Sequence, residues 1–169
     1  MVHSIELIFD ADTEAVVRGI WDALRGAHIP AQAAAGRPHT TLTVARHLTS
    51  DADAALGDLL SGFPFGCRLG AVLIFGRSPG VLARSVVPTD QLLGMQADVH
   101  RRCLPFMDSA PMPHTAPGQW SPHVTLARRV DPDRLATAVR IAGQPAEIVG
   151  QAIGLRHWDG DRRTEHLLW

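Results

Sequence analysis

The pentapeptide Pro-His-x-Thr-Leu occurs twice in the chain, at residues 38–42 and 122–126. In an extended strand alternate side chains share a face, so each copy presents an imidazole beside a hydroxyl. These side chains are His39 and Thr41 in the first copy and His123 and Thr125 in the second. Of two facing imidazoles, one can accept a proton while the other donates one, and the hydroxyls can bind phosphoryl oxygens. The pattern is suited to in-line attack on a phosphodiester without a metal.

A structural role for these histidines is the simpler alternative. The chain has nine histidines, so a bare His-x-Thr can arise by chance, as at residues 47–49, where Ser50 and Asp51 follow and a loop before a helix is expected. The two complete copies share the preceding Pro, the following Leu, a β-like run behind them and equivalent places in the two halves. For the matched pair, catalysis is therefore the favoured interpretation.

Composition limits the class of protein. A chain of 169 residues with 46% hydrophobic and 20% charged residues has the size and core of one ordinary domain. The net charge of −1, without a basic run, argues against tight binding to long nucleic acid, so we expect an RNA end or a small nucleotide as substrate. All sixteen basic residues are arginine, which excludes a lysyl-nucleotide intermediate. We expect no cofactor.

The cellular compartment of the protein can also be predicted. Cys67 and Cys103 show no paired spacing, and the first residues lack the basic start and apolar core of a signal peptide. No apolar stretch is long enough to span a bilayer. We therefore expect a cytoplasmic, reduced protein that is monomeric and makes no contact with membranes.

The predicted elements alternate regularly. Hydrophobic periodicity and turn residues give strands near 5–9, 39–45, 67–75, 81–87, 123–128, 147–158 and 165–169, helices near 10–28, 50–60, 89–103 and 131–142, and a turn at 76–80. Each half thus reads strand, helix, histidine strand, helix, strand. We predict one domain over 1–169 whose two lobes, approximately 1–75 and 80–169, exchange strands about a pseudo-twofold axis and face both histidine strands to one cleft.

The two histidine strands, the run at 120–128 and the hairpin and helix between the motifs resemble the two-histidine phosphoesterase superfamily. The similarity is greatest to its bacterial 2'-5' RNA ligase and RNA 2',3'-cyclic phosphodiesterase branch. This resemblance implies an α+β fold in which two antiparallel sheets line a central cleft, with helices outside. It also implies that His39 and His123 are the catalytic acid and base, that Thr41 and Thr125 bind phosphate, and that neither metal nor ATP is needed.

Several further residues are candidate substrate contacts. Arg37 shares strand parity with His39, and Arg129 with His123, so both could reach a phosphate, although both could equally be solvated strand ends. Trp158 could stack on a base, or simply pack. Trp120 has the opposite parity to His123 and is expected to pack.

The Pro-rich segment 104–118 is long for a connection within a compact domain. It could form a lid that carries His114 to the substrate, but a stiff surface loop is the favoured interpretation. The chain contains no His-x-His, His-Glu-x-x-His or Cys-x-x-Cys pattern, so no metal site is expected.

Three hypotheses follow. The first is a phosphoesterase that opens 2',3'-cyclic phosphates, or reversibly makes and breaks 2'-5' bonds, at RNA ends. The second keeps this chemistry on a small nucleotide, such as a cyclic phosphate of ADP-ribose or a signalling oligonucleotide. The third is a non-catalytic module that binds RNA ends. The near-identity of the two motifs leaves open which histidine is the acid.

Overall fold

The computed structural model describes residues 1–76 and 79–169, so the predicted turn at 76–80 lies partly outside the described residues. Its seven strands form one antiparallel sheet in the order β1-β2-β5-β4-β3-β6-β7. The strands are β1 (His3–Phe9), β2 (His39–Ala45), β3 (Phe65–Phe75), β4 (Gly80–Val86), β5 (His123–Val130), β6 (Ile148–Asp159) and β7 (Thr164–Leu168). Because β1 also pairs with β6, the first six strands close into a ring, and β7 lies on the free side of β6.

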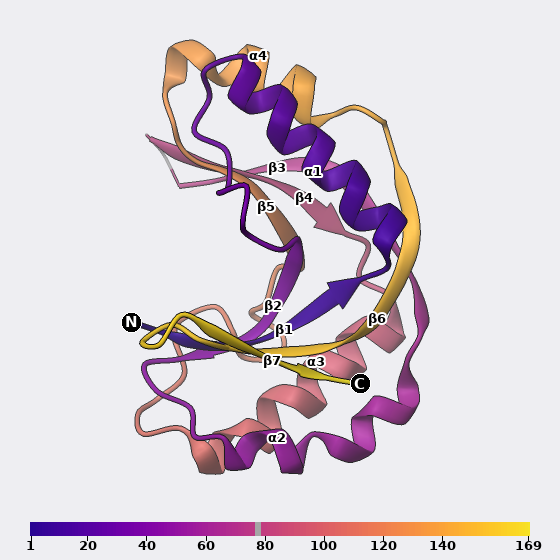
Figure 1. The fold of residues 1–169 in the computed structure, drawn as a ribbon, viewed down its shortest axis with the longest axis vertical. Coiled ribbons are helices and arrows are strands. Elements are labelled where there is room, and N and C mark those ends of the chain that lie inside the picture. The colour runs from indigo at the N-terminus through magenta and orange to yellow at the C-terminus, as the bar shows by residue number, and fades with distance from the viewer. Residues whose placement is uncertain (77–78) are drawn as a thin grey trace.

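The ring has two lobes joined by β6 (Figure 1). The first part of β6 pairs with β3 and the remainder pairs with β1. The lobe of β3, β4 and β5 is covered by α1 (Ala11–Gly26) and α4 (Leu135–Ala142), and the lobe of β1, β2 and β7 by α2 (Asp51–Ala55) and α3 (Asp90–Cys103). The predicted α+β class, with antiparallel sheets inside and helices outside, is confirmed.

Local capping chemistry explains where the two long helices begin. The Asp10 carboxylate accepts a bond from the Thr13 amide at 3.0 Å, and the Thr89 hydroxyl accepts one from the Leu92 amide at 3.2 Å. The helix predicted over 50–60 is shorter than expected: α2 ends at Ala55, and a 3₁₀ helix occupies Gly57–Gly62. Glycine at the junction favours this interruption because it is a poor helix former.

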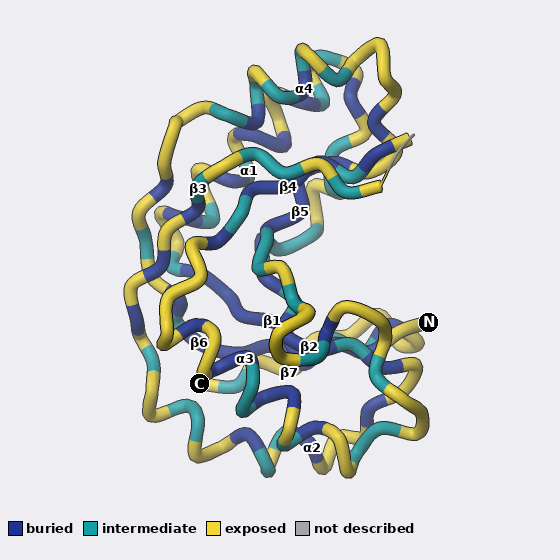
Figure 2. The backbone as a smooth tube through the Cα atoms, turned by 180° about the vertical axis from the view of Figure 1, so that it is seen from behind, coloured by how far each residue is buried: buried dark blue, intermediate teal, exposed yellow. Residues whose placement is uncertain are grey.

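The core lies between the ring and its helices, where buried segments follow the strands (Figure 2). Thr40, Leu42, Val124 and Leu126 are fully buried on β2 and β5. Strand alternation therefore leaves the motif histidines on the opposite face. No helix within residues 1–76 and 79–169 is long and apolar enough to cross a membrane.

One charged side chain lies inside this core. Arg84 on β4 is 0% exposed, and among the described residues no carboxylate lies within ion-pair distance of it. Its guanidinium instead donates five hydrogen bonds to backbone carbonyl oxygens, those of Leu69, Gly70, Ala142, Pro145 and Ala146. Arg84 thus connects β3 to the segment between α4 and β6.

Replacing Arg84 by methionine should reduce the free energy of unfolding by at least about 3 kcal/mol, because each buried carbonyl left unpaired costs about 1–3 kcal/mol. Urea denaturation measures the change. Arg101→Met is the control, since the Arg101 side chain is 68% exposed and should shift stability by no more than about 0.5 kcal/mol. A loss below about 1 kcal/mol in Arg84→Met would contradict a structural role for these bonds.

Candidate active site

The two motif histidines are held in the same way. In each, Nδ1 lies 2.7 Å from the carbonyl oxygen two residues earlier, that of Arg37 for His39 and that of Ser121 for His123. A carbonyl can only accept, so Nδ1 carries a hydrogen and Nε2 is left to exchange protons. The intervening proline restricts the residue before it to an extended conformation, which fixes the carbonyl that orients the ring.

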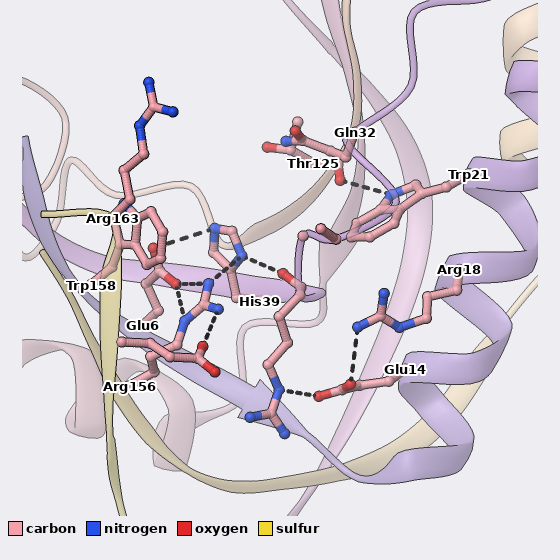
Figure 3. A pocket seen from close by; sticks show the side chains of 14 residues that line it. Glu6, Glu14, Arg18, Trp21, Gln32, His39, Thr125, Arg156, Trp158 and Arg163 are labelled. Carbon is pink, nitrogen blue, oxygen red and sulfur yellow. Dashed lines mark hydrogen bonds and ion pairs between the residues drawn. The ribbon is translucent and has the colours of Figure 1, made fainter. Parts of the chain in front are cut away.

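The register of β2 against β5 brings the four motif residues together. Thr40 pairs with Val124 in antiparallel orientation. Their neighbours therefore meet crosswise, with His39 beside Thr125 and His123 beside Thr41. The cavities agree with this arrangement: one of about 720 Å³ is lined by His39 and Thr125 (Figure 3), and one of about 450 Å³ by His123 and Thr41. Each imidazole thus lies near the hydroxyl of the other motif.

His123 is in a setting that favours the neutral ring. Burial lowers its pKa, and the positive charges of Arg128 and His39 lower it further, against the opposing hydrogen bond to Ser121. The ring of Phe75 lies 4.6 Å from the His123 ring, centroid to centroid. A neutral His123 can accept a proton through Nε2 near pH 7.

His39 has a different, charged environment (Figure 3). Its Nε2 lies 3.5 Å from the carboxylate of Glu6, which is 4% exposed and accepts a 2.7 Å bond from the Ser4 hydroxyl. Glu6 pairs across the strands with buried Arg156, whose Nε donates to it at 2.7 Å. Burial lowers the pKa of Arg156, but Glu6 and Glu165 outweigh this and raise it. The Arg156 guanidinium also lies 3.2 Å from Nδ1 of His39, so the ring has a carboxylate near Nε2 and a guanidinium near Nδ1.

Glu6 and Arg156 are not among the site residues that the sequence predicts. The available signal was a single carboxylate among the apolar residues Ile5 to Phe9 of the first strand, with an arginine in the last long strand. A charged residue in such a place needs a buried partner. Since the pairing of β1 with β6 spans nearly the whole chain, the sequence alone did not identify that partner.

The other predicted contacts divide into two groups. Arg37 and Trp158 line the larger cavity with His39, where Arg37 donates to Glu14 at 2.5 Å and the Arg156 guanidinium lies 5.6 Å from the Trp158 ring centroid. Arg129 is exposed, with φ 55°, outside the residues that line either cavity. Two register shifts between β4 and β5 break the parity that related it to His123.

Two residues border the smaller cavity with His123. Trp120 is partly buried against the core, and its indole nitrogen donates to the carbonyl of Thr41 at 2.9 Å. His114, from the Pro-rich segment, is exposed at the same cavity. Among the described residues, no group of three candidate metal ligands includes His39 or His123.

Comparison with known proteins adds the family context. The sequence model of the 2'-5' RNA ligase superfamily matches residues 11–162. TT0787 of Thermus thermophilus has a TM-score of 0.63 and 17% identity, over 100% of this chain and 96% of that chain. LigT of E. coli complexed with 3'-AMP has a TM-score of 0.60 and 17% identity, over 98% and 91%. Usb1 of Kluyveromyces marxianus has a TM-score of 0.53 and 14% identity, over 99% and 97%. The search of curated proteins gave no match.

Replacing Glu6 by glutamine should lower the free energy of unfolding by about 3–5 kcal/mol, because the buried Arg156 charge loses its closest partner. Glu147→Gln is the matched control, since Glu147 and Arg68 form an exposed pair at 3.2 Å that should contribute at most about 1 kcal/mol. Chemical denaturation of both variants makes the comparison. Equal losses in the two variants would show that the Glu6–Arg156 pair contributes no more to the free energy of unfolding than the exposed pair.

Proposed function

The chain belongs to the 2'-5' RNA ligase superfamily, and we propose that it is a metal-independent phosphoesterase acting on 2',3'-cyclic phosphates, or on 2'-5' bonds, at RNA or oligonucleotide ends. The observation that carries the proposal is the matched pair of histidines, each with Nδ1 anchored to a carbonyl 2.7 Å away. The E. coli LigT structure holds 3'-AMP and a Usb1 structure holds uridine monophosphate, which supports a nucleotide substrate here.

In the proposed hydrolysis, His123 is the base and His39 the acid. The neutral Nε2 of His123 takes a proton from a water molecule while the oxygen of that water forms a bond to phosphorus. The bond from phosphorus to the 3' oxygen breaks, and that oxygen receives the proton from Nε2 of His39, which leaves a 2'-phosphate. Thr41 and Thr125 donate hydrogen bonds to the non-bridging oxygens, where negative charge increases. Joining a 5' hydroxyl to the same cyclic phosphate keeps these roles, because the hydroxyl replaces water as the nucleophile, whereas cleavage of a 2'-5' bond back to the cyclic phosphate exchanges them.

The different environments of the rings support this assignment. His123 is half-buried beside Phe75, with a lowered pKa that makes the proton-free ring available. His39 is then left as the acid, with its Nε2 3.5 Å from the Glu6 carboxylate and its Nδ1 3.2 Å from the Arg156 guanidinium. An acid and a base need opposite protonation states, and the lowered pKa of His123 supports that ring as the base.

The larger cavity favours a small nucleotide as a second candidate substrate. Its lining includes four arginines and three glutamates, so it lacks the strong positive charge that binding to long RNA would use. Its volume of about 720 Å³ is in the range of small-molecule sites. Within the described chain, Arg163 is the guanidinium of this cavity that has no carboxylate partner, and it is exposed (Figure 3).

The choice between substrates can be measured directly. The ratio of kcat/KM for a dinucleotide ending in 2',3'-cyclic phosphate to that for a longer RNA with the same end distinguishes the two. A strong preference for the longer RNA would contradict the small-nucleotide candidate. Tight binding of both compounds without any product would instead indicate a binding module.

His39→Ala and His123→Ala should each lower kcat/KM by at least about 10²-fold, since each removes one partner in proton transfer. The assay uses EDTA, a 2',3'-cyclic phosphate substrate and NMR to identify the phosphate position in the product. His28→Asn is the control because His28 is exposed at the end of α1, with φ 57°, a conformation that asparagine tolerates. Turnover that survives both alanine changes would exclude the mechanism.

The pH dependence tests which ring is the base. Because the pKa of His123 is lowered, kcat/KM in the hydrolytic direction should rise with pH and level off below about pH 6.5, the ordinary value for histidine. Arg128→Gln removes one of the positive charges that lower this pKa, so the rising limb should move to higher pH. The matched control is Arg129→Gln, whose charge lies outside both cavities and should leave the limb in place. An unmoved limb in Arg128→Gln, at low ionic strength, would contradict His123 as the base.

A further inference from the structure

A second cluster of histidines and carboxylates lies at the start of β1. This is the end of the strand that is farther from α1. It joins His3 on β1, His47 in the loop after β2, and Asp161 in the turn between β6 and β7. The donor atoms of these three side chains all lie within 4.8 Å of one another. None of the three residues lines the cavities of His39 or His123.

Two of the three donor distances in this cluster fit a tetrahedral metal centre, and the third is no longer than 4.8 Å. His3 Nε2 lies 3.3 Å from His47 Nδ1 and 3.2 Å from Asp161 Oδ2. Bonds from Zn²⁺ to imidazole nitrogen and carboxylate oxygen measure about 2.0–2.2 Å, so two ligands of a tetrahedral ion lie about 3.3–3.6 Å apart. Two imidazoles and a carboxylate are also a donor set that suits zinc.

The fold holds these donors in place. His3 pairs with Asp159 in the β1–β6 ladder, and its side chain is only 3% exposed. The turn that carries Asp161 packs closely on the chain before β1: a Cβ atom on Gly160 would lie 2.1 Å from the carbonyl oxygen of Val2. Glycine is therefore required for the approach that brings Asp161 to His3.

Two buried polar atoms without a partner lie beside the cluster. Within the described residues, three buried side-chain atoms have no hydrogen-bond partner, and two of them, His3 Nδ1 and His157 Nε2, belong to this region. Both histidines line the same cavity of about 230 Å³, together with His47. Neither atom is one of the three donors, since His3 faces His47 and Asp161 through Nε2 and His157 is not part of the group.

The neighbouring charges leave room for a cation. Asp159 Oδ1 lies 3.3 Å from His3 Nε2 and accepts two backbone amides of the turn, which fix its direction. The positive groups nearby already have partners: Arg162 lies 3.8 Å from Asp159 Oδ2, and the amino group of Met1 contacts Asp161 Oδ1. Asp161 Oδ2 remains directed at His3.

We propose that His3, His47 and Asp161 bind one Zn²⁺ ion, with Asp159 or a water molecule in the fourth position. The ion connects the start of β1, the loop after β2 and the β6–β7 turn, and so stabilises the lobe that carries His39. It has no part in phosphoryl transfer. Its presence or absence is therefore independent of the proposed phosphoesterase activity, which is assayed in EDTA.

The test titrates metal-free protein with ZnCl₂ by calorimetry and with CoCl₂ by visible spectroscopy. We expect one Zn²⁺ per chain, a raised Tm, and the d–d absorption of four-coordinate Co²⁺. His47→Ala and Asp161→Asn should each weaken Zn²⁺ binding by at least about 10-fold, as loss of a direct ligand costs no less than loss of an outer-shell partner. Both residues are exposed, so both variants should fold, which the Tm without metal verifies.

His166→Ala is the control because His166 borders the same cavity, but its Nδ1 lies 3.5 Å from Asp53 and outside the three donors. This variant should bind Zn²⁺ like the wild type. Absence of Zn²⁺ binding by the wild type, or binding that His47→Ala and Asp161→Asn leave unchanged, would overturn the proposal and leave the cluster as an ion-pair network. Loss of binding in His166→Ala alone would equally overturn it, by moving the site to Asp53.

Discussion

The short antiparallel contact between β2 and β5 is the constraint on which the arrangement of the site depends. It pairs Thr40 with Val124, both fully buried, and it joins the two lobes on the side opposite β6. A shift of one residue would turn both motifs over and bury the imidazoles in the core. The apolar side chains that alternate with the motif residues prevent that shift, because Leu42 and Leu126 can only face inward. Packing of the core thus fixes which side chains reach the cavities.

The motif prolines affect the orientation of the histidine rings, whereas the register decides which face the rings are on. Each places an extended residue before the histidine strand, and the carbonyl of that residue holds Nδ1 of the imidazole. The ring is then oriented by backbone, which has little freedom to move, and no further side chain is needed to set its tautomer. The same local solution in both lobes explains why the pattern includes Pro as well as His and Thr.

Much of the fold and site could be predicted because the signals are local. Strand alternation around His39 and His123 depends on neighbouring residues only. The capping residues Asp10 and Thr89 likewise bind amides within a few positions in the sequence. The prediction for Arg129 relied on unbroken alternation along β5, and the bulges opposite β4 removed that basis. Only closure of the ring brings Glu6 to Arg156 and His3 to Asp161. These partners lie so far apart in the sequence that no local pattern relates them.

Closure of the ring also makes the two halves of the site chemically unequal. The motifs are nearly identical, yet β1 inserts beside β2 and brings the Glu6 carboxylate to His39, while the strand beside β5 is β4. His123 therefore has Phe75 and a positive neighbour, Arg128, where His39 has the Glu6 carboxylate and the Arg156 guanidinium. A pseudo-symmetric pair with equal environments would favour the same protonation state in both rings, whereas proton transfer in one direction needs opposite states. The difference between the two environments thus comes from the strands that flank the motifs, and not from the motifs themselves.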